Sequence, residues 1–281
     1  MIKEHVARLL DVAEMEDVGS GDHTSLACIN ESNTCKATLL YKESGIASGI
    51  AVAQEILYQV DTSFKIEKLV DDGSPIKSGQ VAMKIEGKTQ KLLTTERTLL
   101  NLVQRMSGVA TTTKKYVDAI AHTNAKVLDT RKTTPGLRWF EKQSVKHGGG
   151  VNHRFGLYDM ILIKDNHIDA AGAIDSAVSQ AKQYCLQLGE PLQIEVEVRN
   201  FDELDEVLAC EGVNRVMLDN FTPEDTRSAV KKINGRLEVE SSGGITLDTV
   251  RAYAETGVDY ISVGALTHSV KCLDISLKIT E

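Results

Sequence analysis

The first third of the chain combines helical spacing of apolar residues with short strand-like runs. Val6, Leu9, Leu10 and Ala13 recur at helical intervals and predict a helix over 3–16, which the turn at Gly19–Asp22 ends. The same region predicts an apolar strand at 37–41, a helix at 49–60, strands at 64–70 and 80–86, and a long helix at about 94–121. A small α+β domain over about 1–110 is therefore expected.

After Asn124 the pattern changes to short aliphatic runs that alternate with helical stretches. Such repeated βα units are typical of a parallel sheet. The runs cover residues 126–128, 160–163, 192–196, 215–218, 237–240 and 260–263. A seventh strand is a candidate between 148 and 157, so we expect fewer than the eight strands of a complete barrel. The second domain is predicted over 111–269, and the segment 270–281 is a candidate to return to the first domain.

Each of the six predicted strands is followed at once by polar or glycine residues. These residues occupy 129–132, 164–166, 197, 219–220, 241–244 and 264–265. In βα-barrels, the carboxyl ends of the parallel strands form the mouth of the active site. We therefore expect these residues to lie around one site.

The segment 129–167 is cationic within an acidic chain. It holds seven Lys or Arg against four Asp or Glu, whereas the whole protein has a formal net charge of −8. This pattern favours binding of a small, highly charged anion, because a nucleic-acid-binding protein would normally have a broad basic face. The alternative is an ordinary solvated charged loop.

Bulk composition narrows the class of protein. A hydrophobic share of 42% and a charged share of 26% are typical of a globular protein, and no apolar run has the ~20 residues that span a bilayer. The N-terminus lacks the apolar core of a signal peptide, so a cytoplasmic protein is expected. Five cysteines without a C-x-x-C pair argue against a disulfide framework and a zinc site. Neither a P-loop nor a complete G-x-G-x-x-G is present.

The last two strand ends have the composition of phosphate-binding loops. Ser242, Gly243 and Gly244, and then Gly264 and Ala265, offer backbone N–H groups that no bulky side chain obstructs. The alternative is that these glycines only allow helices to pack closely on the strands.

Two carboxylates stand at successive strand ends. Glu197 and Asp219 suit either a Mg²⁺ ion that carries polyphosphate or hydrogen bonds to ribose hydroxyls. Glu195 points to the same face as Glu197, and the placement at the strand end favours Glu197.

Cationic side chains supply the remaining candidate chemistry. Lys164 alone would fit a Schiff-base lysine, but its neighbours favour direct contact with anions. Arg131 and Arg154 have the planar fork that binds carboxylate or phosphate bidentately. His153 is a candidate donor to a carboxylate, with a structural role as the alternative.

Together these residues resemble the quinolinate phosphoribosyltransferase family. The segments that carry the resemblance are 95–110 (TERTLLNLVQRMSGVA), 129–138 (DTRKTTPGLR), 148–154 (GGGVNHR), 162–168 (LIKDNHI), 194–198 (IEVEV), 217–220 (MLDN), 240–245 (ESSGGI) and 261–269 (ISVGALTHS). They occur in the family's order over nearly the whole chain. Gln143-Ser144 and His23 depart from the expected pattern, which affects local packing rather than chemistry.

The resemblance implies a fold and an activity. The expected fold is α/β, with an N-terminal α/β sandwich domain and a C-terminal open seven-stranded parallel α/β barrel of type II phosphoribosyltransferases. The expected reaction converts quinolinate and 5-phosphoribosyl 1-diphosphate (PRPP) to nicotinate mononucleotide, diphosphate and CO₂, as in de novo NAD biosynthesis. Mg²⁺ is the expected cofactor, without an organic cofactor. A homodimer, in some members a hexamer, is expected, with no nucleic-acid or membrane partner.

The resemblance also assigns roles to individual residues. It places quinolinate against Arg131, His153, Arg154 and Lys164, with Arg97 contributed by the partner subunit. It places PRPP and its Mg²⁺ near Lys132, Lys164, Glu197 and Asp219. The phosphates would meet Lys132, Ser242, Gly243, Gly244, Gly264, Ala265 and His268.

Three alternatives stay open from the sequence. One is a phosphoribosyltransferase for a pyridine monocarboxylate such as nicotinate. Another is a barrel aldolase or decarboxylase that forms a Schiff base on Lys164. The third is a barrel that binds phosphometabolites as a sensor without catalysis.

Overall fold

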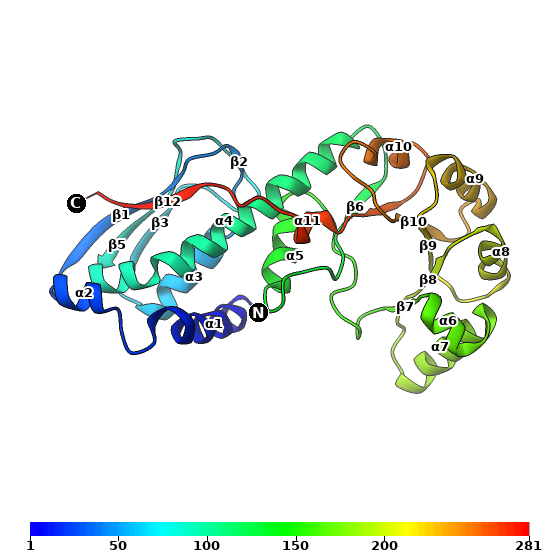
Figure 1. The fold of residues 1–281 in the computed structure, drawn as a ribbon, viewed down its shortest axis with the longest axis horizontal. Helices are drawn as coiled ribbons and strands as arrows, with labels where there is room; N and C mark the ends of the chain where they lie inside the picture. Colours follow the sequence, from blue (N-terminus) through cyan, green and yellow to red (C-terminus); the bar gives the residue numbers. More distant parts are fainter. Residues whose placement is uncertain (281) are drawn as a thin grey trace. The chain divides into compact units, whose positions relative to one another are not determined.

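The computed structural model describes residues 1–280 (Figure 1). The chain forms two compact units, which are described separately. The first unit comprises 1–114, 133–149 and 269–281, and the second comprises 115–132 and 150–268. Division of the chain into domains at 1–110 and 111–269 stays a prediction.

The first unit contains a four-stranded antiparallel sheet with helices packed against it. Its strands are ordered β12 (Ile275–Ile279), β1 (Thr34–Tyr41), β5 (Val81–Lys88) and β3 (Lys65–Lys68). A small second sheet joins β2 (Gly45–Ile46) to β4 (Pro75–Ile76). The helices that belong wholly to this unit are α1 (Ile2–Ala13), α2 (His23–Cys28), α3 (Ile50–Val60) and α5 (Arg138–His147).

Alternating apolar residues of β1 and β5 face α3 and α4 (Thr89–Ala119) and form the core of the first unit. Leu39 and Ile85 are buried from the sheet, and Leu92 and Leu99 are buried from α4. The predicted long helix therefore begins earlier than expected, because Leu92 is already on its buried face. The predicted N-terminal helix continues beyond α1 as a short π-helical turn, Glu14–Val18.

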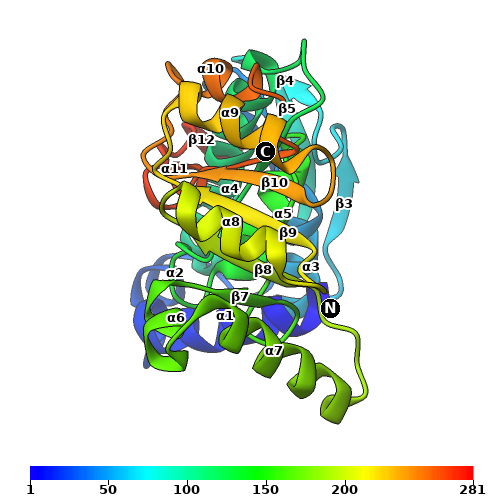
Figure 2. The same ribbon diagram turned by 90° about the vertical axis from the view of Figure 1, so that its right-hand side faces the viewer.

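The second unit contains a six-stranded parallel sheet (Figure 2). The strand order is β6 (Lys126–Leu128), β11 (Tyr260–Ser262), β10 (Glu238–Ser242), β9 (Arg215–Asp219), β8 (Ile194–Val198) and β7 (Ile161–Ile163). In place of a seventh strand, Val151 makes an isolated parallel bridge to Leu128. The sheet is open between Val151 and β7, since no ladder joins them within residues 1–280.

Helices that connect the strands lie on the outer side of this sheet, as Figure 2 shows for α8 and α9. They are α6 (Asp165–Ala171), α7 (Ile174–Leu188), α8 (Phe201–Ala209), α9 (Pro223–Ile233) and α10 (Val250–Ala254). The short helix α11 (Ala265–His268) follows β11, the last strand of this sheet in the chain. Local sequence fixes several starting points. Asn200 and Thr222 cap α8 and α9 through their side chains, and Pro223 occupies the first turn of α9.

Every strand of the sheet runs in the same direction, so the carboxyl ends share one edge. β8 is buried along its whole length, as expected of a parallel strand with both faces covered. The predicted α/β architecture with a parallel sheet is confirmed. None of the helices within residues 1–280 is long and apolar enough to cross a membrane.

Candidate active site

The residues that follow the parallel strands line one cavity of about 850 Å³ in the second unit. The predicted site residues found in its wall are Arg131, Lys132, His153, Arg154, Lys164, Glu197, Asp219, Ser242, Gly243, Gly244, Gly264, Ala265 and His268. Arg97 is the exception, because it is exposed on α4 in the first unit. The sequence therefore predicted which strand ends meet, since parallel strands place their carboxyl ends together.

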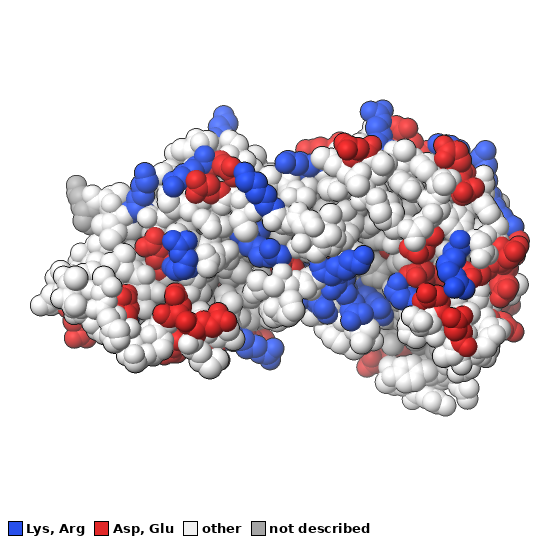
Figure 3. All heavy atoms as spheres, viewed as in Figure 1, with Lys and Arg blue, Asp and Glu red and all other residues white. Residues whose placement is uncertain are grey.

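Two arginines in the cavity wall lie close to each other. Burial lowers the pKa of Arg154, and the positive charge of Arg131 lowers it further. Arg154 donates a hydrogen bond of 3.2 Å from its guanidinium to the carbonyl of Met160. Figure 3 shows a group of Lys and Arg side chains over the loops between α5 and β7. Two guanidinium groups held together in this way favour a ligand with more than one negative charge.

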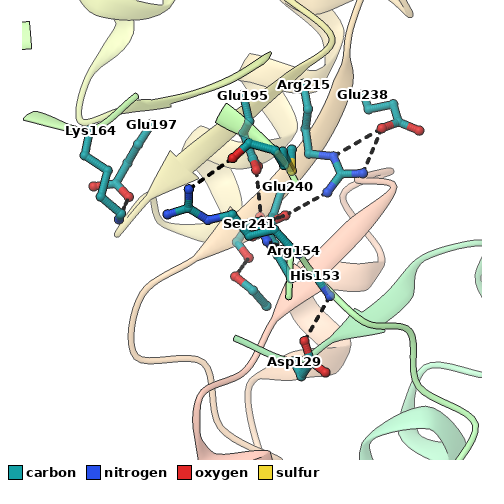
Figure 4. A network of polar contacts seen from close by, with 12 residues as sticks. Asp129, His153, Arg154, Lys164, Glu195, Glu197, Arg215, Glu238, Glu240 and Ser241 are labelled. Atoms are coloured by element: carbon teal, nitrogen blue, oxygen red, sulfur yellow. Dashed lines mark hydrogen bonds and ion pairs between the residues drawn. The ribbon is translucent and has the colours of Figure 1, made fainter. Parts of the chain in front are cut away.

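Lys164 directly follows β7 and forms an ion pair with Glu197, which lies near the end of the neighbouring strand β8 (Figure 4). The side chain of Lys164 is 42% exposed and that of Glu197 is 10% exposed. The backbone N–H of Lys164 donates to Nδ1 of His167, which fixes the start of α6. The ammonium group therefore sits at the cavity on a well-anchored backbone.

A buried carboxylate fixes the loop that carries His153 and Arg154. Asp129, at the end of β6, is fully buried and accepts hydrogen bonds from the Asn152 amide and from the backbone N–H of His153, the latter at 2.9 Å. The contact explains why Asp129 follows a strand without facing the ligand space. It holds 152–154 against the carboxyl end of β6.

Beside the cavity, His153 joins a buried network of charged groups (Figure 4). Its Nε2 lies 3.0 Å from Glu195 and 3.4 Å from Glu240, and its Nδ1 accepts the backbone N–H of Arg154 at 2.7 Å. Arg215 connects Glu240, at 3.3 Å, to Glu238, at 2.9 Å. Three strands thus contribute carboxylates and a guanidinium to one network, which is buried except at the exposed Glu238.

The network perturbs the titration of its members. Burial alone would lower the pKa of His153, but Glu195 and Glu240 outweigh burial and raise it to about 9. Burial and the nearby charge of Glu240 raise the pKa of Glu195 to about 7, against the opposing effect of His153. Within residues 1–280, one oxygen of Glu195 and one of Glu240 have no hydrogen-bond partner. The protonation of each of the three side chains therefore depends on the charge of the other two.

The loop after β10 approaches the loop after β9 closely enough to require glycine. Gly243 has φ +101°, and a Cβ there would lie 2.1 Å from Oδ1 of Asn220. Asn220 itself has φ +58°. The Asn220 N–H donates to the carbonyl of Ser242 at 2.9 Å, and the Asn220 side chain occupies the space that a Cβ at Gly243 would need. Ser242, Gly243 and Gly244 line the cavity with little side-chain bulk, which suits a phosphate-binding loop.

A second close approach surrounds Gly264. A Cβ at this position would lie 2.9 Å from Cδ of Lys132 and 3.1 Å from Cδ2 of His268. The hydroxyl of Thr267 donates to the carbonyl of Lys132 at 2.8 Å and ties α11 to the loop after β6. A lysine, a histidine and a bare backbone are thereby gathered at one part of the cavity, which suits a phosphate group.

Glu197 and Asp219 are the carboxylates that fit a divalent cation. They lie at the ends of the adjacent strands β8 and β9 and line the same cavity. Carboxylate oxygens with room for water are the donor set that Mg²⁺ prefers. Glu195 is instead fully buried with His153, so the two glutamates of β8 have different surroundings.

Sequence reasoning missed two charged residues of this site. Glu240 lines the cavity, and Arg215 supports it from within the sheet. A signal existed for Glu240, which stands two residues before Ser242 on the same face of β10. Nothing in the sequence indicated that Arg215, at the opposite end of a strand, would pair with it.

Fold and cavity together define a class: a two-unit α/β protein whose parallel, barrel-like sheet holds an anion-binding site at its carboxyl edge. Comparison with family models identifies the protein family within this class. The model described as "Quinolinate phosphoribosyl transferase, C-terminal domain" matches residues 109–278, and the corresponding N-terminal domain model matches 22–107. The chain belongs to the quinolinate phosphoribosyltransferase family, so the resemblance found in the sequence is confirmed.

Individual relatives agree over nearly the whole chain. The probable nicotinate-nucleotide pyrophosphorylase (carboxylating) of Bacillus subtilis is 43% identical, over 97% of this chain and 93% of the relative. Quinolinate phosphoribosyltransferase (decarboxylating) 1b of Nicotiana tabacum is 46% identical, over 96% of this chain and 81% of the relative. The crystal structure of NadC from Streptococcus pyogenes is similar with a TM-score of 0.91 at 39% identity, covering 98% of this chain and 97% of that one.

Proposed function

We propose that this protein transfers the phosphoribosyl group of PRPP to quinolinate and releases diphosphate and CO₂. The observation that carries the proposal is the single cavity in which cations from separate βα units meet two glycine-containing loops. Quinolinate brings two carboxylates, and PRPP brings a 5-phosphate and a diphosphate. A site for both must supply several positive charges and backbone donors in one space.

Quinolinate would bind through its two carboxylates at the cationic side of the cavity. Arg131, Arg154 and Lys164 are the groups that would hold them, with His153 at the same wall. Arg97 would come from a partner subunit in a homodimer. Two arginines near each other favour a dicarboxylate over nicotinate, because one carboxylate would leave part of the positive charge uncompensated.

PRPP would bind at the carboxyl ends of β10 and β11. Its phosphates would accept hydrogen bonds from the loops at 242–244 and 264–265, near Lys132 and His268. Glu197 and Asp219 would hold Mg²⁺ or ribose hydroxyls. A bound Mg²⁺ would neutralise charge on the diphosphate as it leaves.

The chemistry follows from positioning and electrostatics. The pyridine nitrogen attacks C1 of the ribose, the new C–N bond forms, and the bond from C1 to diphosphate breaks. The carboxylates near the ribose stabilise the positive charge that develops on the ring, while Lys132 and the loop N–H groups stabilise the departing diphosphate.

Loss of CO₂ then uses the positive charge on the substrate itself. The alkylated nitrogen is cationic and stabilises the electron pair that remains on the adjacent carbon when its carboxylate leaves as CO₂. That carbon then takes up a proton. Because the substrate supplies this positive charge, we predict that the reaction needs no organic cofactor. A homodimer and a cytoplasmic location also remain predictions.

Product analysis tests the proposal. The purified protein with Mg²⁺ and PRPP is supplied with quinolinate or nicotinate, and nicotinate mononucleotide, diphosphate and CO₂ are measured. We expect equal amounts of all three from quinolinate and little product from nicotinate. Turnover of nicotinate alone would reject the substrate, a borohydride-trapped adduct on Lys164 would favour the aldolase, and PRPP binding without diphosphate release would favour a sensor.

A further inference from the structure

The charges of Lys164 and Glu197 compensate each other in the cavity wall. Their ion pair joins the ends of two hydrogen-bonded strands, and both side chains line the cavity. Within residues 1–280, Glu197 is the acidic group within ion-pair distance of Lys164. The partially exposed lysine can move, whereas the glutamate is held in a largely buried position.

The two partners have different uses once ligands arrive. Under the proposed function, the Lys164 ammonium faces a carboxylate of the pyridine, and Glu197 faces the metal-bound sugar phosphate. Each use competes with the existing ion pair, because an ammonium or carboxylate shared between two partners holds each of them less strongly. The first ligand to bind therefore weakens the pair, and the second ligand then finds its own group more available.

We propose that the Lys164–Glu197 ion pair couples the binding of the two substrates, since the sugar phosphate withdraws Glu197 and frees Lys164 for the dicarboxylate. The inference rests on the proposed function, because it takes the two ligands from there. Linkage makes the coupling reciprocal, so each ligand strengthens the other by the same factor. A factor of roughly 5 to 20 is at the lower end of typical couplings.

Asp219 provides a matched control. It stands on the adjacent strand, lines the same cavity and carries the same charge, but its carboxylate accepts a 2.7 Å hydrogen bond from the Asn220 amide, and Lys164 pairs with Glu197 instead. Removing either charge makes the cavity more positive and favours anions in general. Of these two carboxylates, only Glu197 forms the ion pair with Lys164, so only its removal breaks that pair.

The experiment measures binding without turnover. Phthalate has the two adjacent carboxylates of quinolinate but a carbon in place of the nucleophilic nitrogen, so it can be combined with Mg²⁺ and PRPP without reaction. Calorimetry gives the phthalate Kd with and without saturating Mg²⁺–PRPP. For the wild type we expect phthalate to bind roughly 5- to 20-fold more tightly when PRPP is present.

The variants separate the ion pair from the general field. The coupling is expressed as the ratio of the phthalate Kd without Mg²⁺–PRPP to the phthalate Kd with it. In the absence of PRPP, E197Q should bind phthalate more tightly than the wild type, and its ratio should be near one. D219N removes a carboxylate that the proposed function also places at Mg²⁺–PRPP, so its phthalate Kd is measured at a concentration of Mg²⁺–PRPP that saturates this variant. Under that condition D219N should keep the wild-type ratio. K164Q gives an independent measurement if E197Q does not fold: it should weaken phthalate, tighten Mg²⁺–PRPP because Glu197 is already released, and also show a ratio near one.

A ratio near one in the wild type, or an undiminished ratio in E197Q or K164Q, would overturn the coupling while leaving the proposed function intact. Loss of the ratio in D219N to the same extent as in E197Q would overturn it as well. If the wild type bound neither phthalate nor PRPP, the proposed function itself would fail.

Discussion

Nε2 of His153 lies 3.0 Å from Oε2 of Glu195, and both side chains are buried at the edge of a cavity lined by cations. The carboxylates of Glu195 and Glu240 therefore lie next to the cationic wall of a cavity that favours anions. Glu195 also raises the pKa of Arg154, against the effect of burial and of Arg131. The buried acids therefore support the cluster of cations when no ligand is bound, at the expense of some attraction for the ligand.

This relationship predicts that stability falls as the pH rises from neutral to about 9. The pKa of His153 is raised from 6.5 to about 9 in the folded state, so its contribution is complete below 6.5 and is lost as the pH approaches 9. Nδ1 of His153 accepts a hydrogen bond from the backbone N–H of Arg154, so protonation of Nδ1 would break this hydrogen bond and is opposed by it. We expect the free energy of unfolding in urea to decrease by ~1–3 kcal/mol over this window.

The variant H153Q should flatten that pH dependence. His153 also holds down the pKa of Glu195, which burial and Glu240 raise from 4.5 to about 7, so H153Q moves the titration of this carboxylate to higher pH. Comparing H153Q with the double variant H153Q/E195Q between pH 7 and 9 separates the two groups. H122Q is the control, because His122 pairs with Glu255 and each side chain is 42% exposed. A wild-type slope in H153Q would show that the buried network does not hold the proton.

Replacing Arg131 or Arg154 with alanine should separate the two substrates. Either change removes a charged hydrogen-bonding partner, so quinolinate binding should weaken by ~2–5 kcal/mol, roughly 30-fold or more. PRPP binding should change far less, because the phosphate-binding loops lie at other strand ends. Calorimetry with each ligand alone measures both effects. Equal losses for the two ligands would contradict the assignment, and R227A, exposed on α9 outside the cavity, should change neither.

Gly243 and Gly244 are expected to tolerate alanine differently. Gly244 has φ +59°, and a Cβ added there would have nothing within 4 Å, so G244A should cost ~1–2 kcal/mol through backbone strain alone. At Gly243 the added carbon would also collide with Asn220, so G243A should cost ~2–4 kcal/mol and weaken PRPP binding as the loop shifts. Urea unfolding and calorimetry measure the two effects. Identical behaviour of both variants would mean that the close approach to Asn220 is not required.

The parallel architecture and the wall of the cavity could be predicted because both depend on local sequence. Strand-length aliphatic runs with polar residues directly after them specify where each strand ends, and Arg131, Lys164, Glu197 and Gly243 all stand at such points. The seventh strand could not be predicted with the same success. Within the segment 148–157, Val151 alone pairs with β6, since glycines precede it and the following residues turn to bond the buried Asp129 side chain.

The interior network was beyond sequence reasoning for a different reason. Glu195, Arg215 and Glu240 come from three strands, and their contacts depend on the register between β8, β9 and β10. Register follows from packing on both faces of the sheet rather than from any one segment. A charged residue inside an aliphatic run indicates an unusual environment, but its partner appears only when the strands are assembled.

Arg97 tests whether two subunits share one active site. It lies on α4 outside the cavity-bearing unit, and the family resemblance assigns it to the quinolinate pocket of a partner subunit. R97A and K164A should each be inactive, but unfolding and refolding them together should restore activity, because mixed dimers contain one site with neither change. For an isologous dimer formed at random, roughly a quarter of the wild-type activity is expected. R97A refolded with wild type and R97A refolded alone give the upper and lower references. If the mixture of the two variants regains no activity, Arg97 acts within its own subunit or not at all.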